Sequence, residues 1–248
     1  MVAKKNKRLM RADTEVPKIV VSQASNEGES YYRLKDNIIY SSDSGKNKVF
    51  QFESAVSGEG KSTVVANTAV ALALSGRKVV VVDLDFRRPK VHRIFSVQNV
   101  QGIAEYMLGE CEASDIIKKT EYGVDIVNRG KSTQNASIIF TSDKFKELIE
   151  MLKKEYDLVL FYCPPILLVS DYNHYCKLSD VVVFVACMGF TRRSQLKEAI
   201  ELMKKHNDNF LGTVVTYRNT GKFSSHYGGY YNNRYYKSLK NQYSEDAE

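Results

Sequence analysis

The sequence predicts an α/β fold in which a doubly wound, mostly parallel sheet carries helices on both faces. Short apolar runs rich in β-branched residues recur along the chain with helical stretches between them, which is the alternation typical of parallel sheets. The expected strands are Val49–Glu53, Val79–Val82, Val124–Val127, Leu158–Phe161, Val181–Ala186 and Leu211–Thr216. The expected helices include Ser62–Leu74, Ser142–Lys154 and Arg192–His206.

Length and composition indicate one folded domain with a tail at each end. The 248 residues are 43% hydrophobic, which is ample for a single large core. We expect a basic, mobile arm over 1–28, a folded domain over 29–219 and a flexible tail over 220–248. Basic residues of the arm contribute to a formal net charge of +7. Such a run is usually solvated, although it also suits an anionic membrane surface.

Targeting and redox signals are weak. No apolar run approaches the ~18 residues that a membrane-spanning helix needs, and no signal peptide is visible, so we expect a cytoplasmic protein unless a partner recruits it to a membrane. The cysteines lack metal-ligand spacing and are expected to be reduced thiols, mostly in the core. They are Cys111, Cys163, Cys176 and Cys187. No nucleic-acid-binding motif accompanies the positive charge, so we expect no nucleic-acid partner.

A glycine-rich loop joins the first expected strand to the first long helix. Gly58 and Gly60 let backbone N–H groups turn toward phosphate oxygens, and the helix N-terminus adds partial positive charge. Lys61 can reach the β- and γ-phosphates, and Ser62 can ligate Mg²⁺. The context predicts a P-loop NTPase-like fold that binds ATP and Mg²⁺. The expected ATP-binding residues of the loop are Ser57, Gly58, Glu59, Gly60, Lys61, Ser62 and Thr63.

The next strand ends in two carboxylates and a guanidinium, at Asp83, Asp85 and Arg87. Ligands of open α/β sheets bind at the carboxyl ends of the strands, so we expect these groups near the bound nucleotide. One carboxylate can act on Mg²⁺ through water while the other accepts a proton from an attacking hydroxyl. Arg87 can neutralise phosphate charge and is a further expected ATP-binding residue.

Together these stretches resemble the Walker A and Walker A′ motifs of the bacterial tyrosine kinases, the autokinases of capsular and exopolysaccharide production. The resemblance spans roughly residues 15–245. It implies an ATP-dependent protein-tyrosine kinase in which Lys61, Asp83 and Asp85 are catalytic, with Asp83 as base, and Ser62 and Asp85 hold the metal. Further matching segments are Gly102–Tyr106, Gly109-Glu110, Gly130-x4-Asn135 and Tyr162-Cys163-Pro164-Pro165.

The C-terminal tail is rich in tyrosine and poor in aliphatic residues from Thr220 onward, so it cannot bury a core and is expected to be mobile. In the family that the chain resembles, such a tail accepts the phosphate. The expected acceptors are Tyr227, Tyr230, Tyr231, Tyr235, Tyr236 and Tyr243. A low-complexity end with incidental tyrosines is the alternative interpretation.

Two departures from the family pattern keep a second function open. Tyr162 stands where the Walker B motif would carry an aspartate, and Tyr32 and Lys35 replace the arginines of the self-association motif that begins at Glu29. They favour a catalytically weak nucleotide-binding paralogue that acts as a regulatory scaffold. A partitioning or cell-division ATPase is a third interpretation, and Val56 counts against it because that class carries a signature lysine there.

The resemblance also implies partners. Related kinases without a membrane segment work with a transmembrane adaptor of the polysaccharide co-polymerase type, which would place this chain at the inner face of the plasma membrane. A cognate tyrosine phosphatase and a second copy of the chain itself are the other expected partners. Acting with these partners, the kinase would control polysaccharide chain length or export.

Overall fold

The computed structural model describes residues 19–21, 26–43, 45–131 and 136–217. One compact unit extends to Thr216, and of the second unit, Tyr217–Glu248, Tyr217 is described. The first unit is built on a seven-stranded sheet with the order β3-β4-β2-β5-β1-β6-β7. The strands are β1 (Val49–Ser54), β2 (Val79–Asp83), β3 (Ile117–Lys119), β4 (Val124–Val127), β5 (Leu158–Tyr162), β6 (Val181–Met188) and β7 (Phe210–Tyr217).

The sheet is mostly parallel, as the sequence predicts. The pairs β4–β2, β2–β5, β5–β1 and β1–β6 are parallel, and β3 runs antiparallel to β4. All six expected strands are present within two residues of their predicted ends. Strand β3 is missing from the sequence-based expectation because Ile117-Lys118-Lys119 is short and at least partly exposed, so it gives no apolar run.

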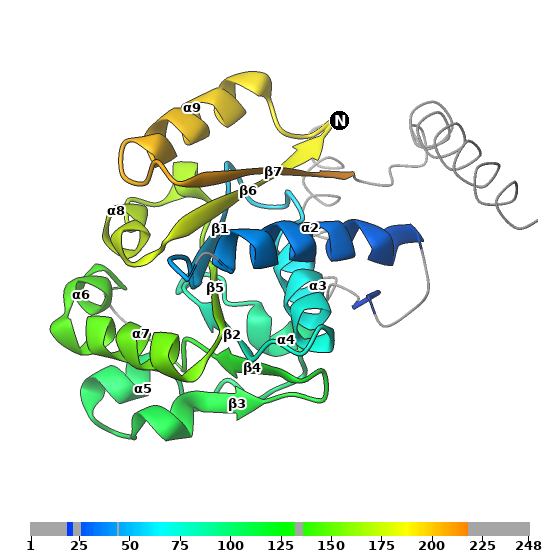
Figure 1. Ribbon diagram of the computed structural model, residues 1–248. Coiled ribbons are helices and arrows are strands. Elements are labelled where there is room, and N and C mark those ends of the chain that lie inside the picture. Colours follow the sequence, from blue (N-terminus) through cyan, green and yellow to red (C-terminus); the bar gives the residue numbers. More distant parts are fainter. Residues whose placement is uncertain (1–18, 22–25, 44, 132–135, 218–248) are drawn as a thin grey trace, which may run out of the picture. The chain divides into compact units, whose positions relative to one another are not determined.

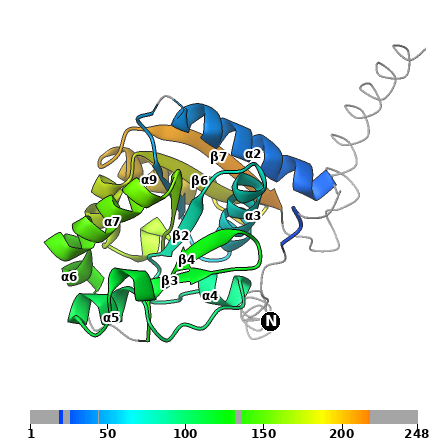
Figure 2. The same ribbon diagram turned by 60° about the horizontal axis from the view of Figure 1, so that its bottom comes forward.

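Helices cover both faces of the sheet, which confirms the doubly wound prediction (Figures 1 and 2). One face carries α2, α3 and α4, and the other carries α5 to α9. The helices are α2 (Asn26–Ser42), α3 (Lys61–Leu74), α4 (Val91–Ile94), α5 (Ile103–Leu108), α6 (Ala136–Thr141), α7 (Asp143–Glu155), α8 (Tyr172–Tyr175) and α9 (Arg193–Lys204). Short 3₁₀ turns lie at Ala113–Ile116, Ile166–Leu168 and Cys176–Leu178.

The five inner strands, β4, β2, β5, β1 and β6, are buried on both sides, so neighbouring residues of one strand belong to two different cores. In β2, Val79 and Val81 pack toward α3, while Val80 and Val82 pack toward α7. Strand side chains alternate between faces, and a sheet covered on both faces therefore needs continuous apolar strands. This explains why β2 consists of four valines followed by Asp83.

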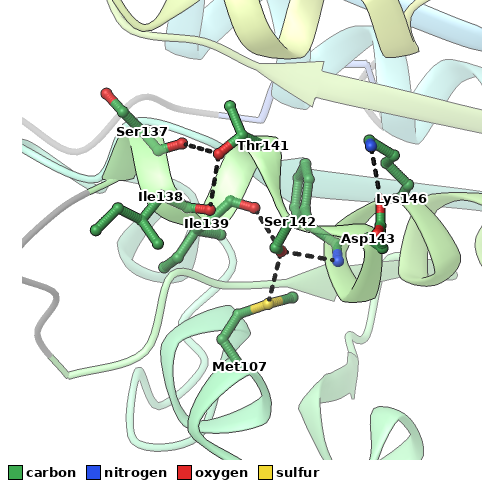
Figure 3. A network of polar contacts seen from close by, with 9 residues as sticks. Met107, Ser137, Ile138, Ile139, Thr141, Ser142, Asp143 and Lys146 are labelled. Atoms are coloured by element: carbon green, nitrogen blue, oxygen red, sulfur yellow. Dashed lines mark hydrogen bonds and ion pairs between the residues drawn. The ribbon is translucent and has the colours of Figure 1, made fainter.

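Aromatic packing and a helix cap order the face that carries α6 and α7. The Phe140 ring lies 5.1 Å from Phe86, 5.4 Å from Phe145 and 5.5 Å from Tyr175, between ring centroids. The Ser142 hydroxyl accepts a hydrogen bond from the Phe145 N–H at 3.2 Å and so caps α7 (Figure 3). This cap sets where α6 ends and α7 begins.

Helix α2 packs against α3 and includes residues on both sides of the predicted boundary between 28 and 29. The predicted tail, with its six tyrosines, and most of the predicted arm lie outside the described residues. Within the described part of the chain, no helix combines the length and the apolarity that a membrane span requires. Cys163, Cys176 and Cys187 are buried free thiols, as expected, and Cys111 is half-buried.

Candidate nucleotide site

The glycine-rich loop connects the end of β1 to the start of α3, as predicted. Gly58 and Gly60 adopt φ angles of 88° and 90°, in the left-handed region that favours glycine. Gly60 is also confined, because a Cβ atom there would lie 3.0 Å from the Thr216 Cγ2 atom. The first turn of α3 contains no acidic residue, so Lys61 and the helix dipole both present positive charge at this end.

Long-range contacts from β7 and from the turn after β6 hold the loop in place. Glu59 is 1% exposed, and its carboxylate accepts hydrogen bonds from the Val56 N–H at 2.8 Å and from the Thr191 hydroxyl. The Glu59 carbonyl accepts one from the Thr216 hydroxyl at 2.6 Å. The side chain of Glu59, an expected ATP-binding residue, is thus engaged by the protein and supports the shape of the loop. Ser57 and Thr63 are half-buried on either side.

Lys61 and Ser62 both contact the residue at the end of β5. Lys61 is 5% exposed, and its ammonium donates to the Ser54 hydroxyl at 3.0 Å and lies 5.5 Å from the centre of the Tyr162 ring. The Ser62 and Tyr162 hydroxyl oxygens are 3.1 Å apart and share a hydrogen bond. Tyr162 therefore faces the loop at the position where an aspartate was expected.

The acidic strand end lies beside the same tyrosine. Asp83 is paired with Tyr162 across β2 and β5, and its buried carboxylate accepts from the backbone N–H groups of Asp85, Lys90 and Val91, each at 3.1 Å. Burial first, and the Asp85 charge second, raise the pKa of Asp83 to about 8. Asp85 is 5% exposed and accepts from the Arg88 N–H at 2.9 Å. Asp83 thus also caps the start of α4.

Arg87 is held by a segment that follows β5. Its guanidinium donates to the Asp171 carboxylate at 3.2 Å and to the Leu168 carbonyl at 3.3 Å. The buried Asp171 also accepts from the Ser137 hydroxyl at 2.6 Å. The ion pair balances the charge of a buried carboxylate. Through Asp171, Arg87 also links the end of β2 to the segment after β5 and to α6. The expected action of Arg87 on phosphate stays a prediction.

A buried acid that sequence reasoning missed lies next to the loop. Glu53, fully buried on β1, accepts from the Gln51 amide at 2.9 Å and from the Tyr175 hydroxyl at 3.2 Å, and its other oxygen has no hydrogen-bond partner among the described residues. Burial raises the pKa of Glu53 to about 7, against the opposing effect of the Lys61 charge. A charged residue inside a predicted buried strand is the one sequence signal that could have found it.

Only a few protein oxygens at this site are suited to bind Mg²⁺. The described residues contain no group of three or more His, Cys, Asp or Glu side chains that could hold a metal ion. Magnesium bound with a nucleotide usually takes one or two protein oxygens beside phosphates and waters. The Ser62 hydroxyl and the Asp85 carboxylate fit that requirement, whereas Tyr162 supplies a hydroxyl without the formal charge of an aspartate.

Comparison with known proteins agrees with this geometry. A model of the AAA domain family matches residues 47–212. The tyrosine-protein kinase YwqD of Bacillus subtilis (strain 168) is 32% identical over 208 residues, which cover 84% of this chain and 87% of the relative. The chain belongs to the bacterial tyrosine kinase family. The tyrosine-protein kinase CpsD of Streptococcus agalactiae is 30% identical over 196 residues, covering 78% of this chain and 84% of the relative.

Solved structures of family members share the fold. The chimerical protein CapA2B2 superposes with a TM-score of 0.75 at 30% identity, over 81% of this chain and 91% of that one. The kinase domain of the Escherichia coli tyrosine kinase ETK gives 0.77 at 25% identity, over 84% and 83%. The septum site-determining protein MinD of Pyrococcus horikoshii, solved with Mg-ADP, gives 0.57 at 26% identity, over 68% and 69%. These neighbours confirm the P-loop NTPase-like fold.

Stability of this kinase-family domain should depend on pH through Glu53. The unfolded carboxyl ionises above its ordinary pKa of 4.5, but the folded one holds its proton up to about 7, so stability falls as the pH rises between these values. We expect Glu53→Gln to remove a loss of about 3 kcal/mol between pH 4 and pH 8. Urea unfolding of both proteins across this range measures it, and parallel pH profiles would contradict it.

The contact between Thr216 and the loop should matter for nucleotide binding. Thr216→Val keeps the shape of the side chain but leaves the Glu59 carbonyl without the hydroxyl that it accepts from at 2.6 Å. We expect a several-fold loss of ATP affinity, on the scale of one hydrogen bond, measured by calorimetry. Thr213→Val on the same strand, at an exposed position, is the matched control and should bind like the wild type. Equal affinity in all three proteins would show that the loop does not need this contact.

Proposed function

We propose that this chain is an ATP-dependent protein-tyrosine kinase that phosphorylates its own C-terminal tyrosine cluster and regulates capsular or exopolysaccharide production or export. The observation that carries the proposal is the meeting of loop and acidic strand end around Tyr162, which contacts Ser62 directly and pairs with Asp83. Nucleotide phosphates and a carboxylate base are needed side by side for phosphoryl transfer to a hydroxyl. The kinases named above support the same chemistry.

In this proposal the loop amides and Lys61 bind and orient the ATP phosphates, and Arg87 adds positive charge nearby. Asp83 is the base for the tyrosine hydroxyl, because a carboxyl with a pKa of about 8 exchanges its proton near neutral pH, where a general base works best. Ser62 and Asp85 would hold Mg²⁺, which when bound neutralises phosphate charge. Thr191 and Thr216 position the loop through Glu59.

The acceptors in this proposal are Tyr227, Tyr230, Tyr231, Tyr235, Tyr236 and Tyr243, which lie outside the described residues. The partners are a transmembrane adaptor of the polysaccharide co-polymerase type, a cognate tyrosine phosphatase and further copies of the chain. The adaptor would hold the kinase at the inner face of the plasma membrane. The resemblance of the whole chain to adaptor-dependent autokinases supports these assignments.

A regulatory scaffold that binds nucleotide but transfers phosphate poorly is the second candidate. The observation that favours it is Tyr162, which brings a phenol to the place where the family resemblance implies an aspartate. One missing preorganised charge typically lowers a rate on the order of 10²–10³-fold, which permits residual activity. A transfer assay therefore separates the two candidates.

Nucleotide binding should require Lys61. The ammonium lies at the start of α3 and is the charge nearest to the expected β- and γ-phosphates, so Lys61→Met should weaken ATP binding by at least about tenfold, the cost of a charge-assisted contact. Calorimetry on wild type and variant measures the loss. Lys197→Met, on the exposed side of α9, is the control and should bind normally. Equal affinity for Lys61→Met would refute the phosphate-loop assignment.

Phosphate transfer should end on the tail. Removing the residues from Tyr227 onward should abolish tyrosine phosphorylation and leave ATP affinity unchanged. The assay follows γ-phosphate transfer by mass spectrometry, with and without the cytoplasmic tail of a candidate adaptor. Phosphate located on Tyr106 would remove the acceptor role from the tail. ATP binding without any transfer, with or without the adaptor tail, would favour the scaffold.

A further inference from the structure

Glu53 is a buried acid that directly precedes the serine bound by the loop lysine. It is 0% exposed on β1, and the next residue, Ser54, accepts a hydrogen bond from the Lys61 ammonium at 3.0 Å. One oxygen of the Glu53 carboxylate accepts from the Gln51 amide at 2.9 Å and from the Tyr175 hydroxyl at 3.2 Å. The other oxygen is buried and has no hydrogen-bond partner among the described residues. An ionised carboxylate is therefore only half satisfied in this place.

Lys61 is the group of opposite charge that acts on this carboxylate. The side chains that interact electrostatically with Glu53 come from the elements packed around it and are Lys61 on α3, Tyr175 on α8, Cys163 after β5 and Cys176 in the 3₁₀ turn after α8. Burial raises the pKa of both thiols and of the phenol, so these three groups are uncharged near neutral pH. The ammonium is thus the charge that favours the ionised form of Glu53 before nucleotide binds.

Phosphates bound by the loop would change this balance. They bring negative charge to Lys61, and like charges inside a protein repel one another strongly. The ionised carboxylate is then disfavoured whether or not the ammonium keeps its hydrogen bond to Ser54, because the phosphate charge offsets the field of the ammonium in both cases. Protonated Glu53 is neutral and avoids this repulsion. Nucleotide therefore binds more tightly to the protein in which Glu53 carries a proton.

We propose that Glu53 is a positioning residue that acts through Lys61 and couples nucleotide binding to the uptake of one proton. The inference rests on the proposed function, because it concerns the same nucleotide site. The proton comes from solvent and binds a carboxylate oxygen of Glu53, and the ammonium is left to act on the phosphates. Free Glu53 is protonated below about pH 7, and bound phosphate raises its pKa further. Affinity is thus full below pH 7 and falls as the pH rises above it.

The experiment is isothermal titration calorimetry of the full chain with ADP, in pairs of buffers that differ in ionisation enthalpy. The heat difference between two buffers gives the number of protons taken up. EDTA is present because Mg²⁺ would offset part of the phosphate charge. Between about pH 6 and pH 8.5, the affinity of the wild type should fall roughly three- to tenfold more than that of Glu53→Gln, which corresponds to a rise of about 0.5–1 in the pKa of Glu53.

Glu53→Gln imitates the protonated acid, so it should bind ADP like the wild type at about pH 6 and lack the extra proton uptake above pH 7. The titrations of the ADP phosphate and of Asp83, whose pKa is about 8, are common to both proteins, so their difference isolates Glu53. Asp125→Asn is the matched control. Asp125 is also a buried carboxylate, but it lies near the amino end of β4 and binds Tyr156 and Lys119, so this variant should keep the wild-type uptake.

Tyr175→Phe tests the same carboxylate without removing it. Phenylalanine keeps the ring that lies 5.5 Å from Phe140 and withdraws the hydroxyl that favours ionised Glu53. The onset of proton uptake should therefore move upward by roughly 0.5–1 pH unit, the equivalent of one hydrogen bond. If thermal melts show that Glu53→Gln is unfolded, this shift alone decides.

Equal proton uptake and parallel affinity profiles in the wild type and Glu53→Gln would overturn the inference and leave the proposed function intact. An unshifted onset in Tyr175→Phe would overturn it as well. If ADP binds only with Mg²⁺, the same differences are expected there at smaller size, and their absence counts equally. Failure of the wild type to bind ADP at any pH, with or without Mg²⁺, would overturn the proposed function together with this inference.

Discussion

Parallel pairing of β5 with both β1 and β2 is the constraint on which the candidate site depends. The register places Tyr162 opposite Phe52 on one side and opposite Asp83 on the other, and the Leu84 N–H donates to the Tyr162 carbonyl at 2.9 Å. Carboxyl ends of parallel strands meet at one edge of a sheet, so three segments that are distant in sequence converge there. If the pairing of β5 with β2 slipped by one residue, the side chains of Tyr162 and Asp83 would lie on opposite faces of the sheet.

The loop depends in turn on contacts made by residues that are distant in the sequence. Glycine at positions 58 and 60 permits the turn, but permissive residues do not choose one conformation. Thr191, in the turn after β6, and Thr216, on β7, make that choice by binding the carboxylate and the carbonyl of Glu59. A change at Thr216 is therefore expected to reach the candidate phosphate site through Glu59 and Gly60.

The regular elements and the local motif were predictable from sequence, and the convergence of distant residues was not. Continuous apolar strands and the Gly-Lys-Ser loop are local patterns, so β1, β2, β5 and the start of α3 were placed correctly. The contacts of Glu59 with Thr191 and Thr216, and of Tyr162 with Ser62, join residues more than ninety positions apart, and no local pattern encodes them. Arg87 also binds the Asp171 carboxylate, and its sequence motif did not predict this partner.

The positions where the sequence breaks its own local rules surround Lys61. Glu53 places an acid in a buried strand, and Tyr162 places an aromatic ring where a small acid was expected. Each compensates for burial of the Lys61 ammonium in a different way. Glu53 attracts it by charge, and the same attraction opposes the rise in the pKa of Glu53. Tyr162 attracts it through the face of its ring. Because the ring needs no ionisation to attract a cation, it stabilises the charged form of Lys61 on both sides of pH 7, whereas Glu53 does so only above about pH 7, where its carboxylate is ionised. The loop lysine therefore retains a stabilising neighbour even when the buried acid is protonated.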